Sequence, residues 1–201
     1  MTKRAFDVLV AFLGLLCLFP IFILIGFAIK LESKGSIFFR QERVGRLTKL
    51  FRIYKFRTMV LSNGVKVSKI TVGKDPRITA VGFFLRRYKL DELPQLINVL
   101  LGDMSLVGPR PEVEEYVNYY TPSEKFLIFS IKPGITDLAS IKFKDESTIL
   151  AQSINPQFAY INEILPRKIN YYSQYAKKNS LWGDIKIIFL TFFEVVKNRE
   201  R

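Results

Sequence analysis

The amino-acid sequence predicts an α+β protein associated with a membrane, in which an N-terminal re-entrant helix precedes a small globular domain. Three observations predict this class. An apolar segment without charge covers residues 8–29, two short aromatic and β-branched runs predict a short β-hairpin, and later segments place apolar residues at helical spacing. We therefore divide the chain into a re-entrant membrane helix with its flanks, residues 1–34, and a globular domain with amphipathic interfacial helices, residues 35–201.

The composition excludes several kinds of enzyme. The chain has 201 residues with 31 Lys+Arg, 18 Asp+Glu and no histidine, which gives a formal net charge of +13. Without imidazole it has no Ser-His-Asp triad, no Cys-His pair and no His-ligated zinc or haem, and the single Cys17 forms no intrachain disulfide. Catalysis would therefore use carboxylates, Lys, Arg, Tyr, hydroxyls or a bound ion, and the net charge favours anionic partners.

The first element is the apolar segment. A straight helix over residues 8–29 would be about 33 Å long and could cross a bilayer core of about 30 Å. Pro20 lies near its middle and lacks the N–H that would continue the helical ladder. The cations that flank the segment, and favour cytoplasm at both ends, are Lys3, Arg4, Lys30 and Lys34. A helix that enters one leaflet, breaks at Pro20 and returns fits these features; a single span with a kink at the proline is the alternative.

A hairpin and a loop follow. Residues 36–39 and 50–56 are the two predicted strands, and a polar connection with a glycine joins them. Residues 62–77 contain Asn-Gly and Asp-Pro pairs and are predicted to form an exposed loop.

Five further helices are predicted from apolar spacing and terminal signals. They cover residues 81–88, 94–101, 112–120, 121–129 and 185–196. Gly102 ends the second of these, and Thr121-Pro122 with Glu124 opens the fourth. The last carries an apolar stripe; such stripes usually face a core, but beside a lipid-bound segment we expect an interfacial helix.

The densest group of reactive side chains is Asp91-Glu92, preceded by the cations Arg86, Arg87 and Lys89. The two acids stand at a predicted helix start, where free N–H groups and the helix dipole favour ionised carboxylates. Such a field can hold a divalent ion and a phosphate together, and an ionised aspartate can attack phosphorus. The alternative is simple capping of the helix by acids, which is more common.

Arg110 is the second candidate. It lies between Pro109 and Pro111 in irregular backbone, and the two prolines restrict the loop and orient a guanidinium that is suited to bidentate phosphate contact. Lys55 and Arg57 extend the cationic set, although most basic residues are merely solvated.

Four motifs recur together in one known family. They are Lys55-Phe56-Arg57-Thr58-Met59; Asp75-x-Arg77-x-Thr79 with Gly82 and Arg86; the long run from Leu90-Asp91-Glu92-Leu93-Pro94-Gln95 to Val107-Gly108-Pro109-Arg110-Pro111; and Lys132-Pro133-Gly134-Ile135-Thr136. With these motifs the sequence closely resembles the bacterial sugar transferase family, the small monotopic phosphoglycosyl transferases. The resemblance runs from Lys3-Arg4 to Asp184-Ile185-Lys186.

The resemblance implies an activity and its partners. Members transfer a phosphosugar from a UDP-sugar to polyprenyl (undecaprenyl) phosphate at the cytoplasmic face of the bacterial inner membrane, release UMP and start polysaccharide assembly. It also implies a monotopic fold with a re-entrant helix bent at the proline, here Pro20. The implied partners are the donor, the acceptor, membrane lipids and, as an option, a second copy in a homodimer; nucleic acid is not among them.

The resemblance also implies residue roles. Asp91 is the implied nucleophile, which forms a phosphosugar-aspartyl intermediate, and Glu92 is the implied Mg²⁺ ligand. The implied substrate-binding residues are Lys55, Arg57, Arg86, Gln95, Pro109 and Arg110.

The sequence departs from the family pattern at several positions. Phe19 replaces the usual serine before the proline, Asp137 replaces the glycine after Pro-Gly-Ile-Thr, and Ser140 replaces a glutamine. Residues 137–172 differ most and are expected to touch the sugar, so the sequence does not identify it.

Three alternatives to a short-form transferase stay open. One is a non-catalytic, membrane-anchored basic module that binds anionic lipid or nucleic acid. Another is a glycosyltransferase that releases UDP. The third is a fragment of a longer transferase, although Met1 lies close before the apolar segment, which favours a short form.

Overall fold

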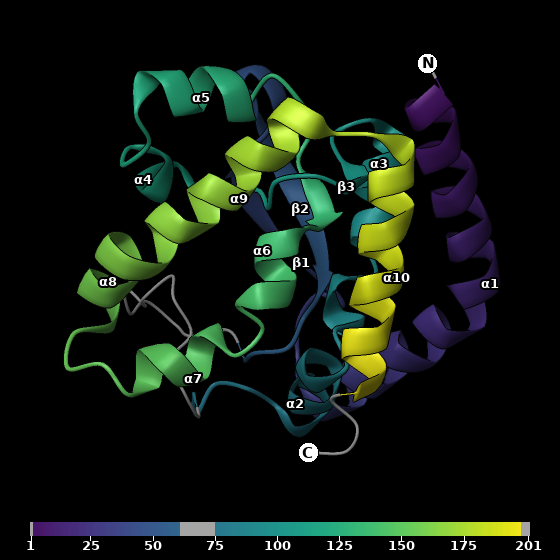
Figure 1. Cartoon of the computed structure of the whole chain (residues 1–201). Coiled ribbons are helices and arrows are strands. Elements are labelled where there is room, and N and C mark those ends of the chain that lie inside the picture. The colour runs from purple at the N-terminus through teal and green to yellow at the C-terminus, as the bar shows by residue number, and fades with distance from the viewer. Residues whose placement is uncertain (1, 61–74, 198–201) are drawn as a thin grey trace.

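The computed structural model describes residues 2–60 and 75–197 (Figure 1). Most of the predicted loop over 62–77 lies outside the described residues. At its described end Asp75 accepts a hydrogen bond from the backbone N–H of Arg77 at 3.0 Å, which closes a turn.

The N-terminal element α1 is one helix over Thr2–Glu32 with Pro20 inside it. The helix is therefore not interrupted at Pro20, as the predicted break would require. It continues past the missing N–H and curves along its length (Figure 1). Within Thr2–Glu32 only Asp7, Ala11, Gly26 and Ile29 are buried. By length and composition this helix could cross a membrane.

Polar contacts hold the first turns of α1 against the domain. The buried carboxylate of Asp7 accepts a hydrogen bond from Ser105 Oγ at 2.8 Å, and Lys3 forms an ion pair with Asp184. Arg4 Nη1 donates to the carbonyl of Val99 at 2.7 Å. The apolar helix therefore starts at a fixed position on the domain.

The predicted hairpin is confirmed. Strands β1 (Phe38–Val44) and β2 (Leu50–Phe56) pair antiparallel from Phe38↔Phe56 to Val44↔Leu50, with a 3-10 turn η1 (Arg46–Thr48) between them. The first strand begins two residues later than predicted and continues to Val44 through polar residues, of which Arg40 and Glu42 are exposed while Gln41 and Arg43 are half-buried.

The middle of the chain forms short elements around this hairpin. They are α2 (Ala80–Arg87), the 3-10 turn η2 (Leu90–Glu92), α3 (Gln95–Leu101), β3 (Ser105–Val107), α4 (Glu114–Val117), α5 (Pro122–Ile128) and β4 (Gly134–Thr136). Two predicted helix boundaries are confirmed. Gly102, with φ 95°, ends α3, and the capping box of Thr121 with Glu124 begins α5. The predicted helix over 112–120 is a single turn, and the parallel pair β3–β4 was not predicted.

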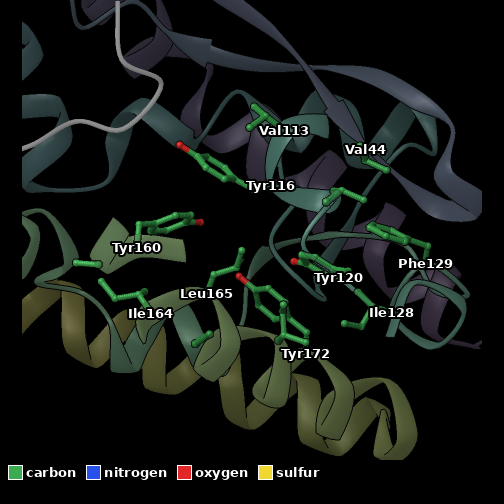
Figure 2. Close-up of a cluster of buried hydrophobic side chains, with 14 of the residues drawn as sticks. Val44, Val113, Tyr116, Tyr120, Ile128, Phe129, Tyr160, Ile164, Leu165 and Tyr172 are labelled. Atoms are coloured by element: carbon green, nitrogen blue, oxygen red, sulfur yellow. The ribbon is translucent and has the colours of Figure 1, made fainter. Parts of the chain in front are cut away.

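The last third is helical. Its elements are α6 (Leu138–Lys142), α7 (Glu146–Ala151), α8 (Pro156–Ala159), the π-helical turn η3 (Tyr160–Ile164), α9 (Leu165–Lys178) and α10 (Leu181–Lys197). The largest core cluster joins α9 and η3 to α4, α5 and the end of β1; Figure 2 shows Tyr120, Tyr160 and Tyr172 inside it.

Helix α10 confirms the helical spacing predicted for 185–196. It buries Asp184 and Ile187, while Phe189, Phe192 and Phe193 are each 60% exposed or more. It lies on the same side of the molecule as α1, away from α7 and α8 (Figure 1). Two helices with exposed apolar side chains therefore share one side of the domain.

Candidate active site

Asp91 and Glu92 lie in the turn η2, between α2 and α3. Lys89, with φ 56° and ψ 20°, adopts the left-handed conformation, which ends the path of α2 and redirects the chain into η2. The sequence places the two acids at a helix start; the structure puts them in a separate 3-10 turn, and α3 begins only at Gln95, which is 2% exposed. The acids therefore lie, partly buried, in a tight turn beside the first turn of α3.

The carboxylate of Glu92 has cations on both oxygens. Lys55 Nζ donates to Oε1 at 2.7 Å, and Arg110 donates from Nη1 to Oε2 at 3.2 Å and from Nη2 to Oε1. Burial acts to raise the pKa of Glu92, but Arg110 and Lys55 outweigh it and hold the pKa well below its ordinary value. Glu92 is therefore ionised at neutral pH.

Asp91 is shifted in the opposite direction. Burial first, and then the charge of Glu92, raise the pKa of Asp91; Lys55, Lys89 and Arg86 offset part of this rise. A helix start would favour ionisation of both acids. For Asp91 this prediction is wrong in direction, because burial and the adjacent anion Glu92 raise its pKa. Neighbouring acids with opposite shifts are suited to different chemical roles.

Two glycines fix the loop that carries Arg110. A Cβ on Gly134 would lie 2.0 Å from the backbone nitrogen of Gly108, so the two backbones touch as only glycines allow. The N–H of Gly134 donates to the carbonyl of Pro109 at 3.0 Å, and the N–H of Gly108 donates to the carbonyl of Thr136 at 3.1 Å. Two of the sequence motifs therefore hold each other in place.

Arg43 supports the same loop from the hairpin. Its Nη1 donates to the carbonyl of Pro111 at 3.1 Å. The next residue, Glu112, is buried and accepts a hydrogen bond from the hydroxyl of Tyr160 at 3.1 Å. Sequence reasoning missed both residues; a single arginine in a predicted connection and an acid after a proline gave no signal.

Lys55 reaches Glu92 because β2 is tied to α3. The fully buried amide of Asn98 accepts from the N–H of Tyr54 and donates to the carbonyl of Arg52, both at 2.9 Å. Burial lowers the pKa of Lys55, and Glu92 offsets part of that effect. The structure thus brings Lys55, Arg110, Asp91 and Glu92 together, with Arg86 acting on Asp91 from the end of α2.

Arg57 is placed elsewhere. Its guanidinium donates to the backbone carbonyls of Lys34 at 2.8 Å, Ser33 at 2.7 Å and Ile29 at 3.3 Å, at the C-terminus of α1. It is 5% exposed. This geometry gives Arg57 the role of a helix cap, so it does not support the implied phosphate contact.

Two residues of the divergent region lie behind Arg110. Asp137 accepts from the N–H of Ser140 at 3.0 Å and caps α6, which gives a structural reason for the acid in place of glycine. Tyr172 is 1% exposed, and its hydroxyl has no hydrogen-bond partner among residues 2–60 and 75–197. Asp137 and Tyr172 both act to raise the pKa of Arg110, after the larger effect of Glu92. The divergent segment thus forms part of the wall of this site.

The acids fit Mg²⁺ in kind. Within the described part of the chain there is no group of three or more His, Cys, Asp or Glu that could hold a metal. Mg²⁺ commonly takes one or two carboxylates, with the remaining ligands from substrate phosphates and water, so Asp91 and Glu92 can supply the protein's share. Because both oxygens of Glu92 already contact cations, the ion would have to displace some of those contacts.

Comparison with known proteins gives consistent matches over nearly the whole chain. A UDP-glucose:undecaprenyl-phosphate glucose-1-phosphate transferase of Escherichia coli (strain K12) is 40% identical over 200 residues, which cover 98% of this chain and 40% of that protein. The exopolysaccharide production protein ExoY of Sinorhizobium fredii is 34% identical over 214 residues, 98% of this chain and 87% of the relative. A UDP-N-acetylgalactosamine-undecaprenyl-phosphate N-acetylgalactosaminephosphotransferase of Aeromonas hydrophila is 35% identical over 94% of this chain and 42% of its own length.

The chain therefore spans about 40% of two of these relatives and most of the third. The pattern of one family, described as bacterial sugar transferase, matches residues 1–198. This match includes both acids of η2, the loop with Arg110 and helix α1. The chain belongs to the bacterial sugar transferase family.

Proposed function

We propose that the protein transfers a sugar 1-phosphate from a UDP-sugar to polyprenyl phosphate and releases UMP through a covalent aspartyl intermediate. The observation that carries the proposal is the pair Asp91 and Glu92, whose pKa values are shifted in opposite directions inside a group of cations. The names of relatives that act on undecaprenyl phosphate support the same class of reaction.

Asp91 acts as the nucleophile in the first step. One Oδ attacks the β-phosphorus of the donor; the new O–P bond forms as the bond from this phosphorus to the bridging oxygen breaks, and UMP leaves with the electron pair. Burial makes the carboxylate more basic than an exposed aspartate, which favours attack once it is ionised.

The acceptor completes the reaction in the second step. An oxygen of polyprenyl phosphate attacks the same phosphorus, the bond to Asp91 breaks, and the carboxylate is restored. The acceptor is already an anion, so no general base is needed, which is consistent with a sequence that has no histidine.

The cations of the site neutralise the phosphates. Arg110 and Lys55, which contact Glu92 in the structure, would turn to the donor diphosphate, and Arg86 would act on the charge near Asp91. The buried Gln95 would shape the floor at the first turn of α3, and Pro109 would keep the loop of Arg110 in position.

Glu92 is the proposed ligand of Mg²⁺. When bound, this ion neutralises the diphosphate and the departing UMP. Glu92 is suited to hold it because its low pKa keeps the carboxylate ionised.

We place the protein at the cytoplasmic face of the bacterial inner membrane, with α1 as a re-entrant helix. The exposed apolar side chains of α1 and α10 on one side of the domain support an interfacial position. The initiation of a polysaccharide is the proposed role, and a homodimer stays a prediction.

The test measures nucleotide products in membranes that contain the protein, UDP-sugars and undecaprenyl phosphate. We expect UMP from wild type and a loss of about 100-fold or more for Asp91→Asn, because the nucleophile is removed. The matched control is Asp145→Asn, an exposed acid without a side-chain capping bond. UDP as the product, or undiminished UMP from Asp91→Asn, would contradict the proposal.

The covalent step has its own test. Wild type incubated with donor alone should gain the mass of one sugar phosphate on the peptide that contains Asp91, while Asp91→Asn should not. If no adduct forms while turnover is robust, and UMP release requires the acceptor, a direct transfer replaces the covalent step.

A further inference from the structure

An apolar groove runs along α1, between this helix and the residues of β1 and α3 that face it. Its cavity volume is about 680 Å³, within the range of small-molecule sites. Phe19, Ile23 and Phe27 form one wall at helical spacing, and Phe38 of β1 and Ile97 of α3 lie opposite. The lining residues on α1 run from position 15 to position 30, a length of about 22 Å along a helix. The groove is therefore long, apolar and open on one side.

The groove is continuous with the candidate active site through its packing. Phe22, Ile37 and Phe38 belong both to the groove and to the core cluster of Ile29, Phe56 and Leu85. Leu90, the residue before Asp91, packs against this same cluster. The inner wall of the groove and the turn that carries the nucleophile therefore rest on one set of apolar side chains.

One charge interrupts the apolar lining. Among the described residues of the groove, Lys30 carries the cation, in the last turn of α1. This end of α1 is held by Arg57, two residues after Lys55, whose ammonium contacts Glu92. The basic end of the groove is therefore linked to Lys55 through Arg57, which directly follows β2.

We propose that this groove binds the isoprenoid chain of the polyprenyl phosphate acceptor, with Lys30 near the phosphate end. The proposal rests on the proposed function and adds the location of the chain. A flexible apolar chain with one anionic end matches an apolar groove with one cation at its end, and no hydrogen bonds are needed along it.

The test fills the groove without changing the lipid-facing character of α1. In Ile23→Trp the larger ring would occupy the groove; Leu24→Trp is the matched control, because Leu24 is 69% exposed on the same helix and does not line the groove. Rates are measured with undecaprenyl phosphate and with a two-isoprene phosphate. We expect Ile23→Trp to raise the KM for the long acceptor about 10-fold, and to leave the KM for the short acceptor and for the UDP-sugar within about 2-fold.

Leu24→Trp should leave all three KM values unchanged, and Lys30→Gln should weaken both acceptors. An unchanged long-chain KM in Ile23→Trp, or an equal rise for both acceptors, would overturn the groove. Neither result bears on UMP release, so the proposed function would survive.

Binding is also measured without turnover. A photoreactive polyprenyl phosphate should crosslink to α1 and to the segment around Phe38, less so in Ile23→Trp, and unlabelled polyprenyl phosphate should compete better than phosphatidylglycerol. Equal competition by phosphatidylglycerol would mean that bilayer lipid fills the groove and would overturn the proposal. This readout decides the proposal even if the protein releases no UMP.

Discussion

Arg110 and Glu92 form a two-point ion pair, with Nη1 of the arginine 3.2 Å from Oε2 of the carboxylate, and Lys55 takes the same carboxylate at 2.7 Å. The cations that we propose to bind phosphates and the acid that we propose to bind a metal therefore neutralise each other. A bound diphosphate would draw Arg110 and Lys55 away, and this would leave Glu92 free for a divalent ion.

This exchange predicts that nucleotide and metal bind cooperatively. UDP should raise the affinity for Mn²⁺, used as a paramagnetic probe, by about 5- to 150-fold, and Mn²⁺ should raise the affinity for UDP by the same factor. In Arg110→Met, Mn²⁺ should bind more tightly without UDP, and the coupling should shrink. Spin resonance and calorimetry measure both constants.

The matched control for this coupling is Arg52→Met, which removes an exposed arginine paired with Glu42 on the hairpin. It should leave both constants unchanged. Equal Mn²⁺ affinity with and without UDP in wild type would show that the ion pairs do not compete with the ligands.

The raised pKa of Asp91 predicts an acid limb in the rate. Below this pKa the carboxylate is protonated and cannot attack, so the rate falls as the pH falls, at a pH above the ordinary range of an aspartate. Lys89 lowers the pKa of Asp91, so Lys89→Gln should move the limb to higher pH. The midpoint of the acid limb is measured from the rate of single-turnover UMP release at different pH values, with Lys49→Gln, at an exposed lysine, as the control. A shift of the midpoint to lower pH in Lys89→Gln would contradict the assignment of the limb to Asp91.

The contact of Gly108 with Gly134 predicts a sharp difference between glycines. Gly134→Ala should lower stability by about 1–3 kcal/mol or more, because its Cβ meets backbone that has no space to move. It should also lower the rate, since the loop with Arg110 would shift. Gly14→Ala is the control: its Cβ would lie 3.4 Å from Leu96 Cδ1, an ordinary contact. Thermal unfolding measures the stability of both variants. Equal melting temperatures would contradict the close approach of Gly108 and Gly134.

The placement of Arg57 predicts that it acts on the helix rather than on the donor. Arg57→Met should lower the melting temperature, because the carbonyls of Ile29 in α1 and of Ser33 and Lys34 just after it lose their donor. It should leave the affinity for UDP within about 2-fold. Lys55→Met should weaken UDP binding instead. A loss of UDP affinity in Arg57→Met that equals the loss in Lys55→Met would restore the phosphate role expected from the sequence.

Much of the fold could be predicted, because its signals are local. The hairpin, the start of α5 at Thr121 and the end of α3 at Gly102 each depend on residues close in the sequence. The pair β3–β4 could not be predicted, because three-residue strands far apart in the chain carry no periodicity.

The candidate site could be predicted in its residues but not in its arrangement. The motifs named Asp91, Glu92 and Arg110, and the structure brings them together with Lys55. The opposite pKa shifts depend on burial, and the supports Arg43 and Asn98 act through backbone atoms, so neither is visible in residue types. Arg57 shows the reverse case: it belongs to a motif, but its partners are backbone carbonyls at and just after the end of α1.

Asn98 has one further consequence. A two-stranded sheet leaves the outer edge of each strand open to pairing with another chain, a common route to aggregation. At Arg52 and Tyr54 the outward carbonyl and N–H of β2 are already bound to the Asn98 amide, which imitates the backbone of a third strand. This protection against edge-to-edge association depends on a single side chain, which also keeps the lysine of β2 at the acid turn.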